Sequence, residues 1–294
     1  MVESFLKYIK FEKRLSPHTI LSYHTDLQQF GDFLKQTFSE KKTELANYGM
    51  VRSWIVELVE KDRDASSINR KIACLRSFYK FLMKREVISK DPMIKIRVLK
   101  TKKKLPHFVK ENDMVEMLDK NLDFTDDHAG LRDQLILELL YGTGMRLSEL
   151  INLKETQIDL PNRTVKVLGK RNKERVIPFS TGLVSLIENY RKAKKKEVEI
   201  IDSQYLLVTD LGSKLYPMMV YRSVKKYLNK FTSVEKRSPH VLRHTYATHL
   251  LNKGAEINAV KDLLGHSSLA ATQVYTHNSM DKLKKVFDQA HPKA

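Results

Sequence analysis

Residues 238–251 read Ser-Pro-His-Val-Leu-Arg-His-Thr-Tyr-Ala-Thr-His-Leu-Leu, and no other stretch says more about the fold. Ser238 and Pro239 are the residue types that cap a helix and fill its first position, so they predict a helix start. His240 and Arg243 then lie on one face of the first turn, where unpaired backbone N–H groups favour an anion. A stray His and Arg on a surface helix would give the same pattern, so other segments must support an anion site.

Residues 142–153 read Gly-Thr-Gly-Met-Arg-Leu-Ser-Glu-Leu-Ile-Asn-Leu, a glycine-containing turn that feeds a helix. Arg146 lies at the junction among apolar residues, where a guanidinium needs an anionic partner. Glu149, three residues later, would supply that partner as a structural ion pair. The same carboxylate would equally orient Arg146 towards an external phosphate. The residues alone leave both interpretations open.

Two alternating segments, 164–168 and 174–179, predict a short β-hairpin, and 205–209 is expected to add a third strand. The hairpin tip is basic, with four Lys or Arg among residues 170–175. Such a tip suits a DNA groove, and Lys170 is a mobile donor able to reach a leaving oxygen. Arg171 and Lys173 are expected to contact DNA. Ordinary turn tips are also basic and solvated, so this signal is weak by itself.

Residues 263–277 read Leu-Leu-Gly-His-Ser-Ser-Leu-Ala-Ala-Thr-Gln-Val-Tyr-Thr-His. Gly265 is typical of a helix end, and the serines that follow are typical of the next helix start, which leaves His266 in the joint. Tyr275 lies on that second, short helix. A tyrosine can attack an activated phosphate as a covalent nucleophile, although most of the twelve tyrosines are expected to pack in the core.

The charge of the chain points to a polyanionic partner. Fifty-three Lys and Arg residues against 35 Asp and Glu give a net charge of +18. Residues 1–104 hold 23 basic and 12 acidic residues and the remainder hold 30 and 23, so both halves are basic. Nucleic acid is the first expectation and an anionic membrane the second, but no basic amphipathic helix with an aromatic face stands out. Solvated lysine-rich faces would also explain the charge.

Several classes of protein are excluded. A single cysteine rules out a disulfide scaffold and cysteine-rich zinc patterns. His240 and His244 share a helix face, but the glutamate of a metalloprotease helix is missing and Arg243 would repel a dication. We therefore expect no metal and no cofactor. With no signal-like segment and no long apolar run, the chain is expected to be cytoplasmic, without a membrane partner.

The chain divides into two expected domains. Residues 1–97 carry apolar stripes at three- and four-residue spacing and predict a helical domain. A basic linker over 98–107 and a mixed helical and strand region over 108–294 follow. Basic residues expected to contact DNA are Arg70, Lys71 and Arg76 on the third stripe and Lys102, Lys103 and Lys104 in the linker. A solvated helix face is the alternative for the first three.

Taken in order, these segments resemble the tyrosine recombinases, and among them the XerC/XerD-like site-specific recombinases of bacteria. The resemblance covers nearly the whole length, with 16–27 and 68–82 similar to the helical core-binding domain of the family. The catalytic positions of the family are matched in order by Arg146, Lys170, His240, Arg243, His266 and Tyr275. Arg171 is a departure, because the family usually has glycine after the hairpin lysine.

The resemblance implies a mainly α fold with a small β-sheet, in which a SAM-like core-binding domain precedes an α+β catalytic domain. It implies that Tyr275 attacks a DNA phosphodiester and forms a 3′-phosphotyrosyl link. Arg146 and Arg243 would neutralise the phosphate, Lys170 would protonate the leaving 5′-oxygen, His240 would move the tyrosine proton and His266 would hold the phosphate. Glu149 would support the first arginine from behind.

The implied partner is double-stranded DNA with an inverted-repeat core site, bound by a homo- or hetero-tetramer on two duplexes. A C-terminal helix near 280–289 would dock on a neighbouring subunit, although packing on its own domain fits the sequence equally. An integrase or transposase of a mobile element would share the same six residues, and a type IB topoisomerase is a further alternative. A catalytically silent DNA-binding protein is the alternative from another class. Compact length favours a Xer-type role in resolving chromosome dimers.

Overall fold

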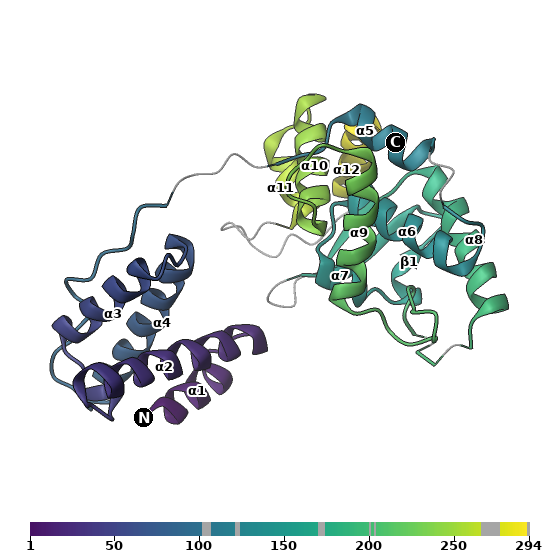
Figure 1. Ribbon diagram of the computed structural model, residues 1–294. Coiled ribbons are helices and arrows are strands. Elements are labelled where there is room, and N and C mark those ends of the chain that lie inside the picture. Colours follow the sequence, from purple (N-terminus) through teal and green to yellow (C-terminus); the bar gives the residue numbers. More distant parts are fainter. Residues whose placement is uncertain are drawn as a thin grey trace. The chain divides into compact units, whose positions relative to one another are not determined.

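The computed structural model describes residues 1–101, 107–120, 124–169, 174–199, 201–202, 204–265 and 277–292 (Figure 1). The chain forms two compact units, Met1–Lys104 and Leu105–Ala294, and each has its own hydrophobic core. The first unit includes Leu99, because the side chain of Asn69 binds its backbone. Asn69 Oδ1 accepts from the Leu99 N–H over 2.8 Å, and Asn69 Nδ2 donates to the Leu99 carbonyl over 2.9 Å. The sequence-derived linker bounds of 98 and 107 stay a prediction.

The N-terminal unit is a packed group of helices. They are α1 (Val2–Phe11), α2 (Pro17–Phe38), α3 (Tyr48–Glu60) and α4 (Ala65–Lys84), with a 3₁₀ turn, η1 (Thr43–Leu45). The expected cap of α2 is present, since Ser16 Oγ accepts a hydrogen bond from the Thr19 N–H. The apolar stripes meet in the core, where the rings of Phe30 and Trp54 lie 4.9 Å apart.

The C-terminal unit is built around α6 (His128–Thr143), whose residues are buried on almost every side. A helix that is buried on most of its sides belongs inside a core, and α6 packs against α8, α9 and α10. The other described helices of the C-terminal unit are α5 (Glu111–Asp119), α7 (Leu147–Ile151), α8 (Thr181–Glu197), α9 (Pro217–Phe231), α10 (Pro239–Asn252), α11 (Ile257–Leu264) and α12 (His277–Ala290), with a 3₁₀ turn, η2 (Glu155–Gln157). The expected mainly α fold with a small sheet is confirmed.

The sheet has three antiparallel strands in the order β1 (Ile158–Asp159), β2 (Thr164–Leu168), β3 (Glu174–Pro178). The hairpin was predicted, but the third strand expected at 205–209 is wrong: described residues 204–209 make only isolated bridges. Side chains from α8 take the backbone groups that a ladder would use. Lys194 Nζ donates to two successive carbonyls over 2.7 and 2.9 Å, and the Tyr190 hydroxyl accepts from the Val208 N–H.

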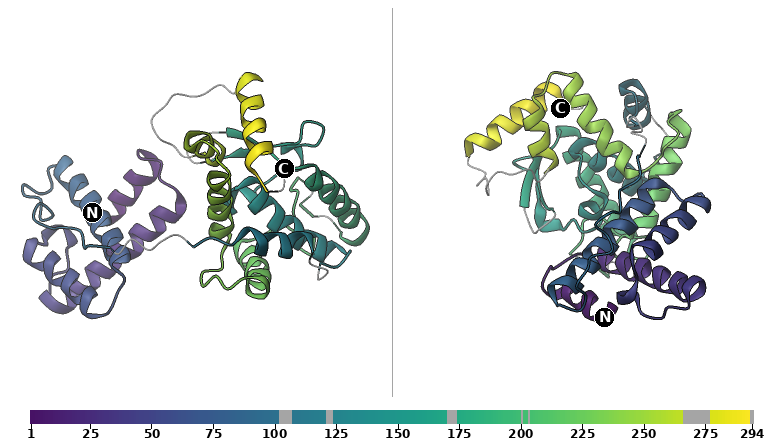
Figure 2. Two further views of the ribbon diagram at one scale, coloured as in Figure 1. Left: turned by 90° about the horizontal axis from the view of Figure 1, so that it is seen from above. Right: turned by 90° about the vertical axis from the view of Figure 1, so that its left-hand side faces the viewer.

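The last helix, α12, packs on its own unit against α10, α11 and β3 (Figure 2). Phe287 and Ala290 belong to the core of that unit, and the His291 ring stacks on Phe287 at 4.8 Å. Within this chain the helix therefore docks in cis. None of the described helices combines the length and apolar character needed to cross a bilayer.

Candidate active site

Arg146 is placed by a sharp turn between α6 and α7. Gly144 ends α6 in the left-handed region, with φ of +60°. A Cβ at this position would lie 2.5 Å from the ring of Tyr246, so the turn requires glycine on both counts. Arg146 follows in an extended conformation as the N-cap residue of α7. The guanidinium thus projects from the start of a helix, next to the turn.

Glu149 holds Arg146 by its backbone and its side chain. Oε2 accepts from the Arg146 N–H over 2.7 Å, and Oε1 accepts from Arg146 Nη1 over 2.8 Å. Burial raises the pKa of Glu149, but hydrogen bonds and charge from Arg175, and then hydrogen bonds from Arg146, outweigh it and hold the pKa below its ordinary value. The ion pair expected from the three-residue spacing is present, with a charged carboxylate.

Arg175 is a third arginine at the site, and the sequence reasoning missed it. The sequence groups Arg175 with the bases of the hairpin tip, but the residue lies inside β3 and is 3% exposed. Nη1 and Nη2 each donate to one oxygen of Glu149 over 2.8 Å, and Nε donates to the Leu263 carbonyl over 2.9 Å. The two-residue period of a strand could have revealed its burial. Arg175 lies two residues before Ile177 and so shares its inward face, and it pairs across the ladder with buried Val167.

Arg243 brings another guanidinium to the same place from α10. Its Nη1 donates to the Gly144 carbonyl and its Nη2 donates to the Leu264 carbonyl over 2.6 Å. Arg146 Nη2 donates to the next carbonyl, that of Gly265, over 3.1 Å. Burial, and then the charges of Arg146 and Arg175, lower the pKa of Arg243 to about 10. Cations held this close repel one another, and an anion between them would relieve the repulsion.

The first turn of α10 adds His240, which is exposed and lies three residues before Arg243. Ser238 occupies the expected N-cap position, but its side chain does not cap the helix. Its Oγ is buried and has no hydrogen-bond partner among the described residues. Within the same residues, no group of three His, Cys, Asp or Glu side chains could hold a metal ion.

The remaining catalytic positions lie outside the described residues. They are Lys170 at the hairpin tip and His266 and Tyr275 beyond α11. The basic positions Lys102, Lys103, Lys104, Arg171 and Lys173 also lie outside them. Their expected roles stay predictions. The structure brings together Arg146, Glu149 and Arg243, which the sequence singled out, and adds Arg175.

The three basic residues of the N-terminal unit differ in what their side chains do. Lys71 is buried, and its Nζ donates to Asp26 over 2.8 Å. Arg70 pairs with the same carboxylate, but 45% of its side chain is exposed. Arg76 is exposed, and its Nη2 donates to the Ile96 carbonyl over 2.5 Å. Arg70 and Arg76 are therefore exposed enough to contact a ligand, whereas the charge of Lys71 is paired with Asp26 inside the unit.

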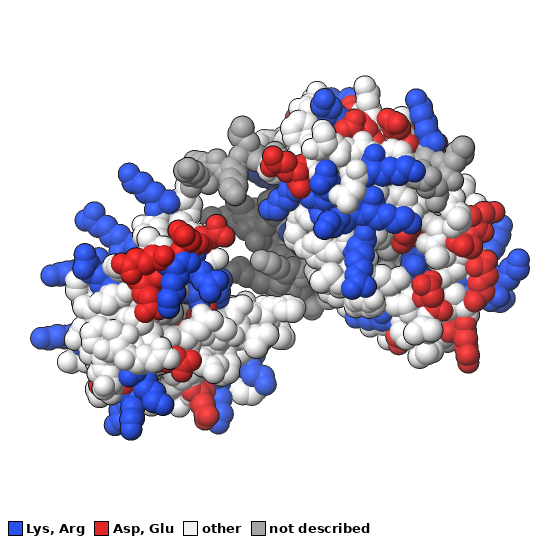
Figure 3. Space-filling view, in the orientation of Figure 1, with Lys and Arg blue, Asp and Glu red and all other residues white. Residues whose placement is uncertain are grey.

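Lys and Arg side chains also gather over α9 (Figure 3). The buried side of this helix faces the core, and its exposed side carries Arg222, Lys225, Lys226 and Lys230. Their spacing of three and four residues places them on one face. This basic stripe was not singled out from the sequence.

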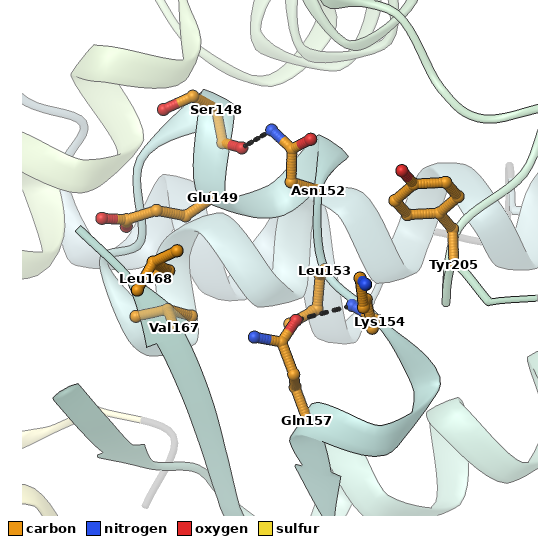
Figure 4. Close-up of a pocket in the computed structure, with 9 residues that line it drawn as sticks. All are labelled: Ser148, Glu149, Asn152, Leu153, Lys154, Gln157, Val167, Leu168 and Tyr205. Atoms are coloured by element: carbon orange, nitrogen blue, oxygen red, sulfur yellow. Dashed lines mark hydrogen bonds between the residues drawn. The ribbon is translucent and has the colours of Figure 1, made fainter. Parts of the chain in front are cut away.

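A cavity of about 400 Å³ lies between α7, β2 and Tyr205 (Figure 4). Glu149 contributes to its wall but turns its carboxylate away from Tyr205 and Lys154. Among the arginines Arg146, Arg175 and Arg243, none lines it. The cavity therefore lies behind the site rather than in it, and we assign it no ligand.

Known proteins share this organisation over its whole length. Residues 107–282 match the model described as "Phage integrase family", and residues 2–86 match "Phage integrase, N-terminal SAM-like domain". Tyrosine recombinase XerC of Staphylococcus carnosus (strain TM300) is 40% identical over 292 residues, which cover 99% of this chain and 97% of the relative. The protein of the same name from Oceanobacillus iheyensis is 38% identical over 304 residues, covering 100% and 96%.

Solved structures show the same fold. A crystal structure of the XerH site-specific recombinase bound to its palindromic difH substrate superposes with a TM-score of 0.72 at 20% identity, covering 97% of this chain and 83% of the other. The Tn1549 transposon integrase in complex with transposon right-end DNA gives 0.71 at 19% identity, covering 97% and 98%. A SAM-like helical unit followed by an α+β unit is the organisation of the tyrosine recombinases. The chain belongs to the phage integrase family.

Proposed function

We propose that this protein is a site-specific DNA recombinase that cuts and rejoins DNA strands through a 3′-phosphotyrosyl intermediate. One observation carries the proposal: Arg146 and Arg243, 97 residues apart in the sequence, converge on the adjoining carbonyls of Gly265 and Leu264. Each donates two hydrogen bonds to described residues, out of five N–H groups. The other three N–H groups on each guanidinium have no hydrogen-bond partner among the residues that the structure describes, and in this proposal they bind a phosphate.

The proposed reaction begins when the Tyr275 hydroxyl attacks the phosphorus of a DNA phosphodiester. A bond forms between the tyrosine oxygen and phosphorus, and the bond to the 5′-oxygen breaks. His240 assists removal of the tyrosine proton, and Lys170 gives a proton to the departing 5′-oxygen. His266 holds the phosphate, while Arg146 and Arg243 stabilise the charge on its non-bridging oxygens. The 5′-hydroxyl of a second strand then attacks the phosphotyrosine and releases Tyr275.

The proposed substrate is double-stranded DNA with an inverted-repeat core site. The excess positive charge and the basic stripe on α9 (Arg222, Lys225, Lys226 and Lys230) support a polyanionic partner. Two duplexes would be held by a tetramer, with α12 moving from its own unit to a neighbour. The full-length likeness to proteins named XerC favours a Xer-type role in resolving chromosome dimers, which takes place in the cytoplasm.

Covalent capture tests the proposal. The protein is incubated with a pool of nicked duplexes of randomised sequence, and the DNA that stays bound after SDS denaturation is sequenced. We expect adducts that share an inverted-repeat sequence. Two copies of that sequence on one plasmid should then recombine. A protein that binds the pool without any SDS-resistant adduct would contradict cleavage by this protein alone, and would leave a partner-dependent enzyme or a DNA-binding module.

A further inference from the structure

The end of α11 is bound by three arginines from three different elements. The carbonyls of Leu263, Leu264 and Gly265 accept, in that order, from Arg175 Nε, Arg243 Nη2 and Arg146 Nη2. The last carbonyls of a helix lack partners within the helix and carry partial negative charge. Each guanidinium therefore binds one carbonyl at the end of α11, and a shift of that helix end would move all three guanidiniums.

Arg175 differs from the other two in burial. It is 3% exposed, whereas the side chain of Arg146 is 23% exposed and Arg243 is half-buried. All three nitrogens of its guanidinium donate within the protein, to Glu149 and to Leu263. Arg175 is thus placed to act on its neighbours rather than on DNA.

Glu149 transmits the position of Arg175 to Arg146. Oε1 accepts from an Nη1 atom of each arginine, and Oε2 accepts from Arg175 Nη2 and the Arg146 N–H. These four bonds fill the acceptor sites of a carboxylate. Because Arg175 grips both oxygens, it fixes the plane of the carboxylate and hence the direction in which Arg146 is held.

We propose that Arg175 is a positioning residue for DNA cleavage, which clamps Glu149 and caps α11 so that the Arg146 and Arg243 guanidiniums meet the same phosphate. This inference rests on the proposed function. It assigns a role in the reaction to a buried residue on β3, the strand that follows the hairpin tip. A purely structural ion pair would stabilise the fold without changing the rate of cleavage by folded protein.

The test compares Arg175→Lys and Arg175→Met with Arg132→Lys and Arg132→Met. Arg132 is a control matched in burial, at 4% exposed and paired with Asp210, and it lies eleven residues before the end of α6, about 16 Å along the helix. Lysine keeps the charge at either position but loses the two-pronged grip. Gly265→Ala is a further variant: its Cβ would lie 2.9 Å from Arg175 Cδ, and the positive φ of +62° would strain the end of α11, so both the Arg175 guanidinium and the carbonyls that the arginines bind should shift.

The readout is the single-turnover rate of adduct formation on a nicked duplex recovered by covalent capture. The duplex is made with either a phosphodiester or a methylphosphonate at the cut position. A methylphosphonate is uncharged, so its cleavage depends less on well-placed guanidiniums. DNA affinity and thermal unfolding are measured alongside, so that rates refer to folded protein.

We expect both Arg175 variants and Gly265→Ala to cleave the phosphodiester about 10- to 100-fold more slowly, with DNA affinity within about threefold of wild type. Their loss on the methylphosphonate should be under about threefold. The Arg132 variants should cleave both duplexes like wild type once corrected for folding. Equal losses on the two duplexes, or Arg175 variants that behave like the Arg132 controls, would overturn the inference. A wild-type protein without adducts would instead overturn the proposed function.

Discussion

Glu149 and Arg146 are joined by two hydrogen bonds that start from opposite ends of the arginine, one from its backbone N–H at 2.7 Å and one from its Nη1 at 2.8 Å. The first bond begins α7, and the second directs the guanidinium. The start of the helix and the direction of the charge are thus set by one carboxylate. The geometry of the proposed phosphate site is therefore part of the fold of the unbound protein.

Arg146→Ala and Arg243→Ala should slow adduct formation by about 10²–10³-fold, because each removes donors aimed at the charge that develops on the phosphate. DNA affinity should change little, since many other basic residues are expected to contact the backbone. Burst measurements on a captured nicked duplex, with binding followed by fluorescence anisotropy, separate the two quantities. A loss confined to binding would assign the arginines to DNA affinity alone.

Glu149→Gln should destabilise the C-terminal unit by about 3–5 kcal/mol, because it leaves the buried Arg175 without its counter-charge. The folded-state pKa of Glu149 is lowered, so its contribution is full above the unfolded value of about 4.3 and is lost as pH falls through the folded value. The gap in denaturant midpoint between wild type and variant should therefore shrink below about pH 4. A gap that stays constant between pH 7 and 3.5 would contradict the assignment.

Gly144→Ala should cost about 1–3 kcal/mol and slow cleavage, because φ is positive and the new Cβ meets the Tyr246 ring. The carbonyl that Arg243 binds would move with the turn. Gly142→Ala is the matched control: it lies two residues earlier inside α6, where a Cβ has open space, and should be neutral or stabilising. Thermal unfolding and adduct formation should both distinguish the pair of variants.

His249 ties α10 to the chain that enters the C-terminal unit. Its Nε2 donates to the Val109 carbonyl and its Nδ1 accepts from the Tyr141 hydroxyl, each over 2.9 Å. Burial lowers the pKa of His249, so the neutral ring stabilises the fold above the unfolded value of about 6.5, and this contribution is lost as pH falls further. His249→Phe should lower the melting temperature clearly at pH 8 and much less at pH 5.5. An equal loss at both pH values would contradict the pH dependence expected of a buried, neutral histidine.

Lys71→Met should destabilise the N-terminal unit and leave DNA affinity nearly unchanged, because its ammonium is buried on Asp26. Arg70 offers the contrast, with nearly half of its side chain exposed beside the same carboxylate. Arg70→Met should reduce DNA affinity and its dependence on salt. Filter binding at several salt concentrations checks both variants, and a fall in affinity for Lys71→Met in folded protein would restore its predicted DNA contact.

The sequence predicted those features that depend on local rules. Pro239 marks the start of α10, and alternation at 164–168 gives the bounds of β2. The pairing of Arg146 with Glu149 also follows from local spacing. The clamp from Arg175 could not be read this way, because its partners are 26 and 88 residues distant and meet it only after the sheet packs on α11. The strand expected at 205–209 is also absent because of contacts distant in the sequence, since Lys194 and Tyr190 bind backbone groups of this segment.

The most direct test of the central claim is to locate the covalent bond. Wild-type protein and Tyr275→Phe are each captured on the same nicked duplex, the DNA is digested to a short stub, and the modified peptide is identified by mass spectrometry. We expect a nucleotide on Tyr275 in wild-type protein and no adduct in the variant. An adduct on another residue, or one that persists in Tyr275→Phe, would contradict it.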